Sequence, residues 1–186
     1  ALLRLADDES PRYVYDPGVV TARSEEVQGL GPIDQSFYAV KANPHPEVLR
    51  LLERRGLGFE CVSPGELDRV FEACPGLDPA RVLFQPNFAA PAEYADAFER
   101  GVHVTVDNVQ PLAEHPDVFA GEELFVRVDP GQGEGHHRKG RTAGAQSKFG
   151  VVPGDLGRLR AAVEQAGATV VGDDPEPREL VIPEGV

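Results

Sequence analysis

Short apolar runs rich in β-forming residues recur at a nearly constant interval, and this period constrains the fold more than any other feature of the chain. Five runs begin at residues 37, 59, 82, 102 and 124, so successive starts lie 20 to 23 residues apart, and a sixth begins at residue 168. Runs this short and apolar are typical of strands buried on both faces of a sheet. We therefore expect six strands, over residues 37–40, 59–62, 82–84, 102–106, 124–128 and 168–171.

Helical patterns fill most of the intervals between these strands. Residues 46–55 carry apolar side chains at helical spacing and have a proline in the first turn. At Ser63 a hydroxyl stands three residues before the carboxylate of Glu66, which is typical of a capping box at a helix start. Two more helices are expected, over residues 91–100 and 156–166.

Strand and helix alternating at this spacing build a parallel sheet with right-handed crossovers. Regularity over at least five units favours a (β/α)8 barrel over a doubly wound sheet. Six strands cannot close such a barrel, so we expect an α/β fold that is a partial TIM-like barrel of about six βα units. The expected organisation is a strand at residues 12–16 and a lead-in helix within 1–30, the partial barrel at 31–172, and a tail at 173–186 with a last short strand.

Composition narrows the classes of partner. The net charge is −13, which disfavours nucleic acid and anionic membrane surfaces. No apolar stretch is long enough to cross a membrane and no signal peptide opens the chain, so we expect a cytoplasmic protein. Two cysteines form no disulfide framework or complete zinc site. The chain has no methionine, even at position 1, so we expect that it is not an intact translation product.

Only three of the 18 basic residues are lysines, namely Lys41, Lys139 and Lys148. Lys41 follows the first strand directly, and catalytic groups of barrels lie where strands end. Partial desolvation there would lower the pKa of the amine and favour the nucleophilic free base. The alternative is a lysine that merely begins an exposed loop.

Four motifs carry a family resemblance. They are YAVKAN at residues 38–43, GFECVSPGEL at 58–67, FVRV at 125–128 and SKFG at 147–150. In this order they resemble the fold-type III pyridoxal-phosphate (PLP) enzymes, a group that includes diaminopimelate, ornithine and arginine decarboxylases. The resemblance covers about residues 12–172 and is strongest to diaminopimelate decarboxylases. It implies a TIM-barrel domain that binds PLP.

The resemblance also assigns roles. Lys41 matches the Schiff-base lysine and proton donor, and Glu66 the carboxylate that faces the pyridinium nitrogen. The alternative is that Glu66 is merely the capping-box acid. Arg127 matches an arginine near the cofactor, and at the end of an apolar strand it needs a buried partner. Glu60 stands where relatives mostly carry aspartate beside the cofactor. Lys148 matches an ion-pair or structural lysine.

Residues 131–148 form a long excursion that contains the pair His136 and His137. Adjacent histidines point apart in an extended chain and no third ligand is obvious, so we expect no metal site. The excursion resembles the corresponding loop in the decarboxylase half of bifunctional aspartokinase–diaminopimelate decarboxylases, which implies a loop over the active-site mouth.

The chain departs from the family after Gly172. Relatives continue there with a histidine motif of the HVGSG type, and later with a glycine-rich phosphate loop and a segment inserted by a partner subunit. We therefore expect an incomplete chain that binds PLP weakly, from a homodimeric parent. The function implied is decarboxylation of a small-molecule amino acid, meso-diaminopimelate to L-lysine. The alternatives are another basic amino acid as substrate, or a non-catalytic decarboxylase-like binding protein.

Overall fold

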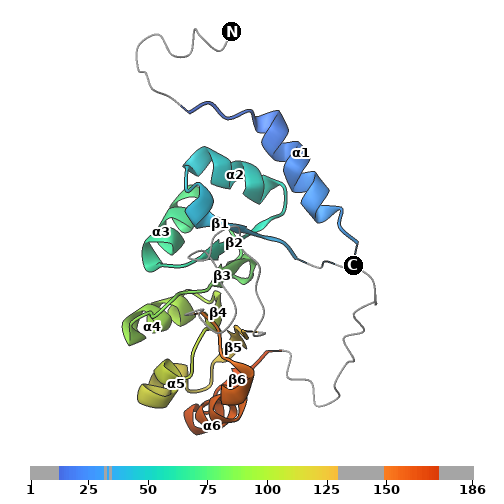
Figure 1. Ribbon diagram of the computed structural model, residues 1–186. Helices are drawn as coiled ribbons and strands as arrows, with labels where there is room; N and C mark the ends of the chain where they lie inside the picture. Colours follow the sequence, from blue (N-terminus) through green and yellow to red (C-terminus); the bar gives the residue numbers. More distant parts are fainter. Residues whose placement is uncertain (1–12, 32, 34, 130–148, 172–186) are drawn as a thin grey trace, which may run out of the picture.

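Six parallel strands form one sheet in which the strand order follows the chain order (Figure 1). The computed structural model describes residues 13–31, 33, 35–129 and 149–171. Each strand begins within one residue of its predicted start, so the predicted period is confirmed. The strands are β1 (Phe37–Ala39), β2 (Gly58–Cys61), β3 (Val82–Phe84), β4 (His103–Val106), β5 (Glu123–Val126) and β6 (Thr169–Val170).

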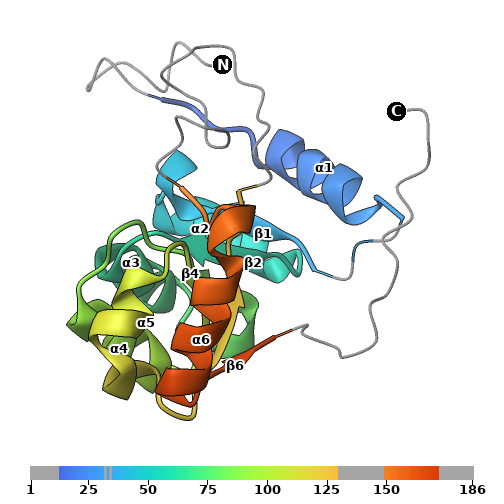
Figure 2. The same cartoon turned by 60° about the horizontal axis from the view of Figure 1, so that its bottom comes forward.

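Helices cover one side of this sheet, except for the first, which packs against the second and lies apart from the strands, as Figures 1 and 2 show. They are α1 (Pro17–Gln28), α2 (Pro46–Arg54), α3 (Pro64–Ala73), α4 (Pro91–Glu99), α5 (Gln110–Glu114) and α6 (Leu156–Ala166). Sheet inside and helices outside is the arrangement of an incomplete (β/α)8 barrel, which confirms the predicted fold class. Within the described ranges, no helix combines the length and apolar character needed to cross a bilayer.

Two expectations about local structure are wrong. Residues 13–16 form no strand, because no described segment runs beside them to pair with their backbone, and the side chains of Tyr13, Val14 and Tyr15 are exposed. The short helix α5 was not predicted. It ends where Pro116 begins a 3-10 turn over Pro116–Phe119, so it is too short to show a helical period.

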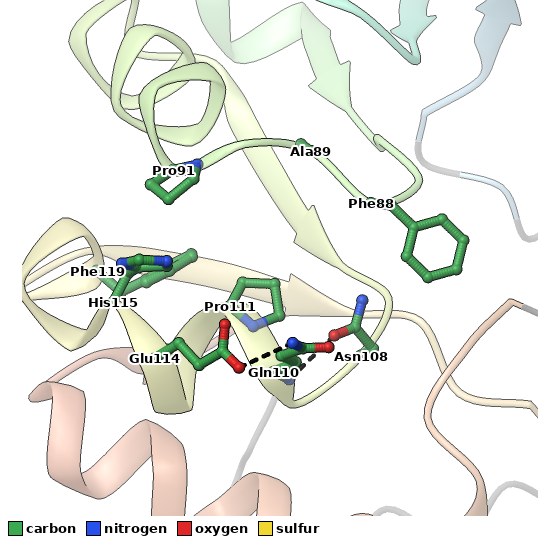
Figure 3. A pocket seen from close by; sticks show the side chains of 9 residues that line it. All are labelled: Phe88, Ala89, Pro91, Asn108, Gln110, Pro111, Glu114, His115 and Phe119. Carbon is green, nitrogen blue, oxygen red and sulfur yellow. Dashed lines mark hydrogen bonds between the residues drawn. The ribbon is translucent and has the colours of Figure 1, made fainter.

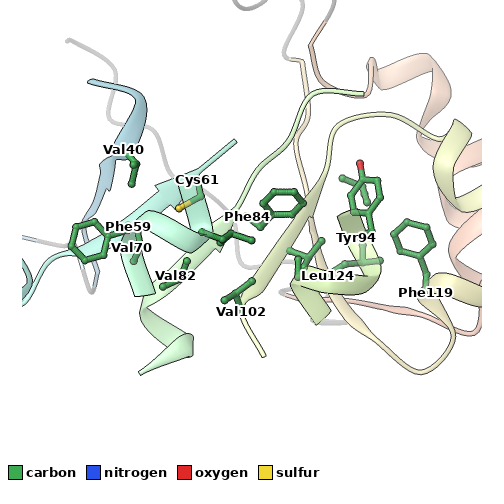
Figure 4. Packing of buried hydrophobic residues seen from close by; sticks show 14 of the residues in the cluster. Val40, Phe59, Cys61, Val70, Val82, Phe84, Tyr94, Val102, Phe119 and Leu124 are labelled. Atoms are coloured by element: carbon green, nitrogen blue, oxygen red, sulfur yellow. The ribbon is translucent and has the colours of Figure 1, made fainter. Parts of the chain in front are cut away.

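The hydrophobic core lies between the sheet and its helices (Figure 4). Phe59 and Phe84 project from the strands and are fully buried. Tyr94 on α4 packs edge-on against Phe84 with ring centroids 6.3 Å apart, and lies 5.2 Å from the ring of Phe119. Burial of each such side chain stabilises the fold by about 1.5–3 kcal/mol. This layer is what holds the strands in register.

The opposite face of the sheet is the inner face of the partial barrel. Parallel neighbours in register point to the same side, and Phe37, Leu83, His103 and Phe125 line one hollow there. The ring of His103 stands edge-on to Phe125, with centroids 5.3 Å apart. Toward the carboxyl ends of the strands the same face becomes polar, and this places functional groups at the barrel mouth.

The outer edge of β6 predicts self-association of the 186-residue chain expressed alone. No described segment pairs with that edge, and unpaired strand edges recruit other chains. We expect oligomers or aggregates and weak PLP binding, measured by light scattering and by cofactor titration. Thr169→Lys should shift the chain toward monomer, because a charge on the edge opposes pairing.

The matched control is Gln165→Lys, which adds the same charge at an exposed position of α6, away from the edge. This control should leave the oligomers unchanged. A cooperative monomer from the unmodified chain, with tight PLP binding, would show that the open edge has no such effect.

Candidate active site

Lys41 and Glu60 meet at the carboxyl ends of β1 and β2. Lys41 lies in the 3-10 turn Val40–Ala42 that follows β1. Glu60 is on β2, where its Cα pairs in register with Ala39. The Nζ atom of Lys41 is 3.6 Å from the Oε2 atom of Glu60, and the Glu60 side chain is only 14% exposed. The strand-end position of Lys41 is as predicted, and the structure adds a half-buried carboxylate beside its amine, a pairing that was not predicted.

The expected desolvation of Lys41 is wrong for this chain. The Lys41 side chain is 60% exposed, because the inner face of the open sheet has no described segment above it. This exposure leaves the amine accessible to a ligand that enters the mouth.

Glu66 begins α3 and its carboxylate closes the preceding turn. The Oε2 atom accepts a hydrogen bond of 2.8 Å from the backbone N–H of Val62. The N–H of Glu66 in turn donates to the hydroxyl of Ser63, at 3.4 Å. The capping geometry is therefore present, although the carboxylate reaches Val62 one residue before the cap. The role beside a cofactor stays a prediction.

Arg127 follows β5 directly, on the inner face of the sheet. Its guanidinium carbon lies 4.7 Å from the centroid of the Phe149 ring, the distance of a cation–π contact. Its backbone N–H donates to the carbonyl of Val106, which continues the ladder beyond β4 and β5. The partner that the sequence required for this arginine thus includes an aromatic ring.

Three polar residues of the inner face were not identified from the sequence. Gln85 and Thr105 line the same hollow as Arg127, and Asp107 follows β4 directly. The alternation of polar and apolar residues along the strands could have identified them. A polar residue between apolar neighbours in a short buried strand projects to the other face. Thr105 is one such residue, since it stands between the buried Val104 and Val106.

Asp107 is a buried carboxyl group, with 1% of the residue exposed. Its Oδ1 atom accepts from the amide of Asn108 at 2.9 Å, and its Oδ2 atom has no hydrogen-bond partner among the described residues. Burial raises the pKa of Asp107 above its usual value, although the bond from Asn108 and the charge of Arg127 act in the opposite direction.

A surface pocket near these residues is a different feature. It lies between the β3–α4 loop and α5, and is lined by Phe88, Asn108, Gln110 and neighbouring residues (Figure 3). Gln110 donates from its side chain to Glu114 at 2.8 Å. Lys41, Glu60 and Arg127 do not line this pocket, so it is not the site at the barrel mouth.

The remaining sequence predictions fall outside the described residues. These are the ion-pair role of Lys148, the absence of a metal at His136 and His137, and the loop over the mouth.

Asp107→Asn should stabilise the gene's complete product at neutral pH. The pKa of this carboxyl group is higher in the folded state than in the unfolded state. The free energy of unfolding of the protein therefore falls as pH rises from the unfolded-state pKa through the folded-state pKa. The neutral amide avoids this loss. The gain over wild type in urea-induced unfolding should therefore be present at pH 7.5 and should fade below about pH 4. An equal change in the exposed Asp117→Asn, or a gain independent of pH, would contradict the burial argument.

Comparison with known proteins agrees with this geometry. The diaminopimelate decarboxylase of Deinococcus radiodurans is 35% identical over 163 residues, which is 88% of this chain and 42% of that protein. The chloroplastic ornithine decarboxylase of Nicotiana glauca is 30% identical over 173 residues, 91% of this chain and 38% of that protein. A crystal structure of diaminopimelate decarboxylase superposes with a TM-score of 0.80 at 29% identity, covering 91% of this chain and 40% of the other.

The chain thus spans about two fifths of the length of these relatives. Residues 19–174 match the family described as pyridoxal-dependent decarboxylase, pyridoxal binding domain. Because this match covers most of the chain and the fold is a partial barrel with Lys41 at a strand end, the chain belongs to the pyridoxal-binding domains of the pyridoxal-dependent decarboxylases.

Proposed function

We propose that this domain serves a PLP-dependent decarboxylase that converts meso-diaminopimelate to L-lysine. The observation that carries the proposal is the Lys41 amine at the end of β1, 3.6 Å from the Glu60 carboxylate, on a domain of this family. The diaminopimelate decarboxylase of Deinococcus radiodurans supports the choice of substrate. The substrate in this proposal is a small amino acid, and the complete enzyme is a cytoplasmic homodimer.

The described residues fit PLP by their chemistry. An aldehyde needs an accessible amine, which the 60% exposed Lys41 provides. A phosphate or carboxylate needs a fixed cation, which the half-buried Arg127 provides. When bound, PLP supplies an electron-accepting ring that takes up the electron pair left by departing CO2.

The side chains at the mouth divide the remaining work. The Nζ atom of Lys41 would hold the cofactor through its aldehyde and, once the substrate amine has replaced it there, would supply the proton that takes the place of the carboxylate. Glu60 orients that amine through the contact of 3.6 Å. Arg127 binds an anionic group. Glu66 would face the pyridine nitrogen and keep it protonated, and its Oε2 atom also accepts from the N–H of Val62.

Two other functions make different predictions. A decarboxylase of another basic amino acid would keep all of these roles, and ornithine decarboxylase similarity supports it as an alternative. A non-catalytic binding protein would keep the fold and need no reactive lysine. Identification of the labelled lysine and turnover of several amino acids separate the three.

Lys41 should carry the covalent link to PLP. The gene's complete product is loaded with PLP, reduced with borohydride and digested, and the modified peptide is mapped by mass spectrometry. We expect the label on Lys41, because it is the described lysine at a strand end of the barrel. Label on Lys139 or Lys148 instead would overturn the assignment, and Lys41→Arg should abolish labelling while it keeps the charge.

Glu66→Gln should lower turnover by about tenfold or more, which corresponds to about 1.4 kcal/mol or more of transition-state stabilisation. The physical reason is that a neutral amide cannot keep the ring nitrogen protonated. The measurement is turnover of meso-diaminopimelate at saturating PLP, together with the thermal midpoint.

Glu93→Gln is the matched control, because the Glu93 carboxylate caps α4 by accepting from the N–H of Ala90 at 2.7 Å. It should reduce stability slightly and leave turnover unchanged. If Glu66→Gln behaves like Glu93→Gln, Glu66 is a helix cap and has no role at the cofactor.

A further inference from the structure

Two segments distant in the sequence join directly behind Arg127. The backbone N–H of Val151 donates to the carbonyl of Arg127 at 2.7 Å, and the N–H of Asp129 donates to the carbonyl of Val151 at 2.9 Å. Val128 and Val151 form an isolated parallel bridge. We call residues 127–129 with 149–151 the Arg127 clamp. The clamp fixes the backbone on both sides of the contact between Arg127 and Phe149.

Phe149 presents the face of its ring to the guanidinium, with the Cζ atom 4.7 Å from the ring centroid. Both side chains are half-buried, which strengthens attraction between a cation and a ring relative to an exposed pair. A planar guanidinium also stacks in a defined orientation, and an ammonium group does not. The contact therefore restricts the rotamers available to Arg127.

Gly150 makes the clamp possible. Its φ is +82°, in the left-handed region, and an added Cβ would lie 2.8 Å from the N atom of Asp129 and 3.1 Å from the carbonyl carbon of Val128. Both obstacles are backbone atoms, so a neighbouring side chain cannot yield to relieve them. Only glycine lets the chain run this close to residues 128 and 129, just after β5, while its neighbour Phe149 covers Arg127.

Asp107 is a second neighbour of Arg127, and it is a charged one. It is buried at the end of β4, the strand beside β5, and the charge of Arg127 acts to lower the pKa of this carboxyl. The guanidinium thus lies near a carboxylate from one strand and against a ring from the clamp. The ring and the carboxylate together restrict where the guanidinium can lie.

We propose that Phe149 is a positioning residue that holds the Arg127 guanidinium ready to bind an anionic group at the barrel mouth. The proposal rests on the proposed function, which supplies two anions of the same chemistry: the phosphate of PLP and the carboxylate of the substrate. Preorganisation makes binding stronger because less side-chain freedom is lost when the ligand binds.

The test is a double-mutant cycle in the gene's complete product. Phe149→Leu should weaken binding of the anion by about two- to thirty-fold, the range of a cation–π contact that is partly desolvated. Phe149→Tyr should restore binding to within about twofold of wild type, because it keeps the ring face. In an Arg127→Gln background, Phe149→Leu should have no further effect, since its role acts through the guanidinium.

Two readouts identify the anion. A raised dissociation constant for PLP, from titration of the apo-protein, assigns the phosphate. A raised KM for meso-diaminopimelate with unchanged PLP affinity assigns the carboxylate. Phe98→Leu is the matched control, because its ring packs against Phe119 in the helix layer, 5.8 Å between centroids, and should change neither value.

A third readout does not depend on PLP or turnover. In protein labelled with 15N-arginine, the Nε–H signal of Arg127, identified by its loss in Arg127→Lys, should show a ring-current shift. This shift should disappear in Phe149→Leu and in Phe149→Met, which both lack an aromatic ring, and it should persist in Phe149→Tyr.

Outcomes that overturn the proposal are specific. Unchanged binding in Phe149→Leu, an equal loss in the Arg127→Gln background, or an unshifted Nε–H signal would each reject it. If the wild-type protein neither binds PLP nor acts on any amino acid, the proposed function fails, and the Nε–H signal alone then decides whether the stack exists.

Discussion

Burial of the helix-facing side chains is the interaction on which the rest of the structure depends. Residues such as Phe59 and Val104 are inaccessible between the sheet and its helices, and this fixes which face each strand turns outward. Because successive side chains of a strand alternate, the same burial forces Glu60 and Thr105 to the inner face. A register slip of one residue would place these polar groups in the core, at a cost of several kcal/mol each. The packing of the core thus positions the polar mouth.

The spacing of the strands was predictable because each strand is buried, and buried strands appear in the sequence as short apolar runs. The strand starts and the fold class were confirmed, and so was the position of Lys41 at a strand end. The exposure of Lys41 was not predictable from local pattern. It depends on what lies across the barrel, and the described sheet has open space there. The same reason explains residues 13–16, since strand pairing is decided by a partner that local propensity does not reveal.

Glu66 shows how one motif can satisfy two physical requirements. Residue spacing predicted a capping box, and the carboxylate accepts a backbone N–H at the start of α3. A carboxylate has two oxygen atoms and can accept several hydrogen bonds, so the bond from the N–H of Val62 leaves capacity for a contact with a cofactor. The capping role and the proposed role at the cofactor are therefore compatible.

Arg127 and Phe149 show why the site could be predicted only in part. An arginine at the end of an apolar strand is expected to have a partner for its charge, and a carboxylate is the first candidate. The ring that it stacks on is 22 positions later in the chain, and only the clamp brings it near. Gly150 permits that approach because it has no Cβ atom, which would collide with the backbone of residues 128 and 129. Backbone geometry of this kind decides where the guanidinium points, and residue chemistry decides only what it can bind.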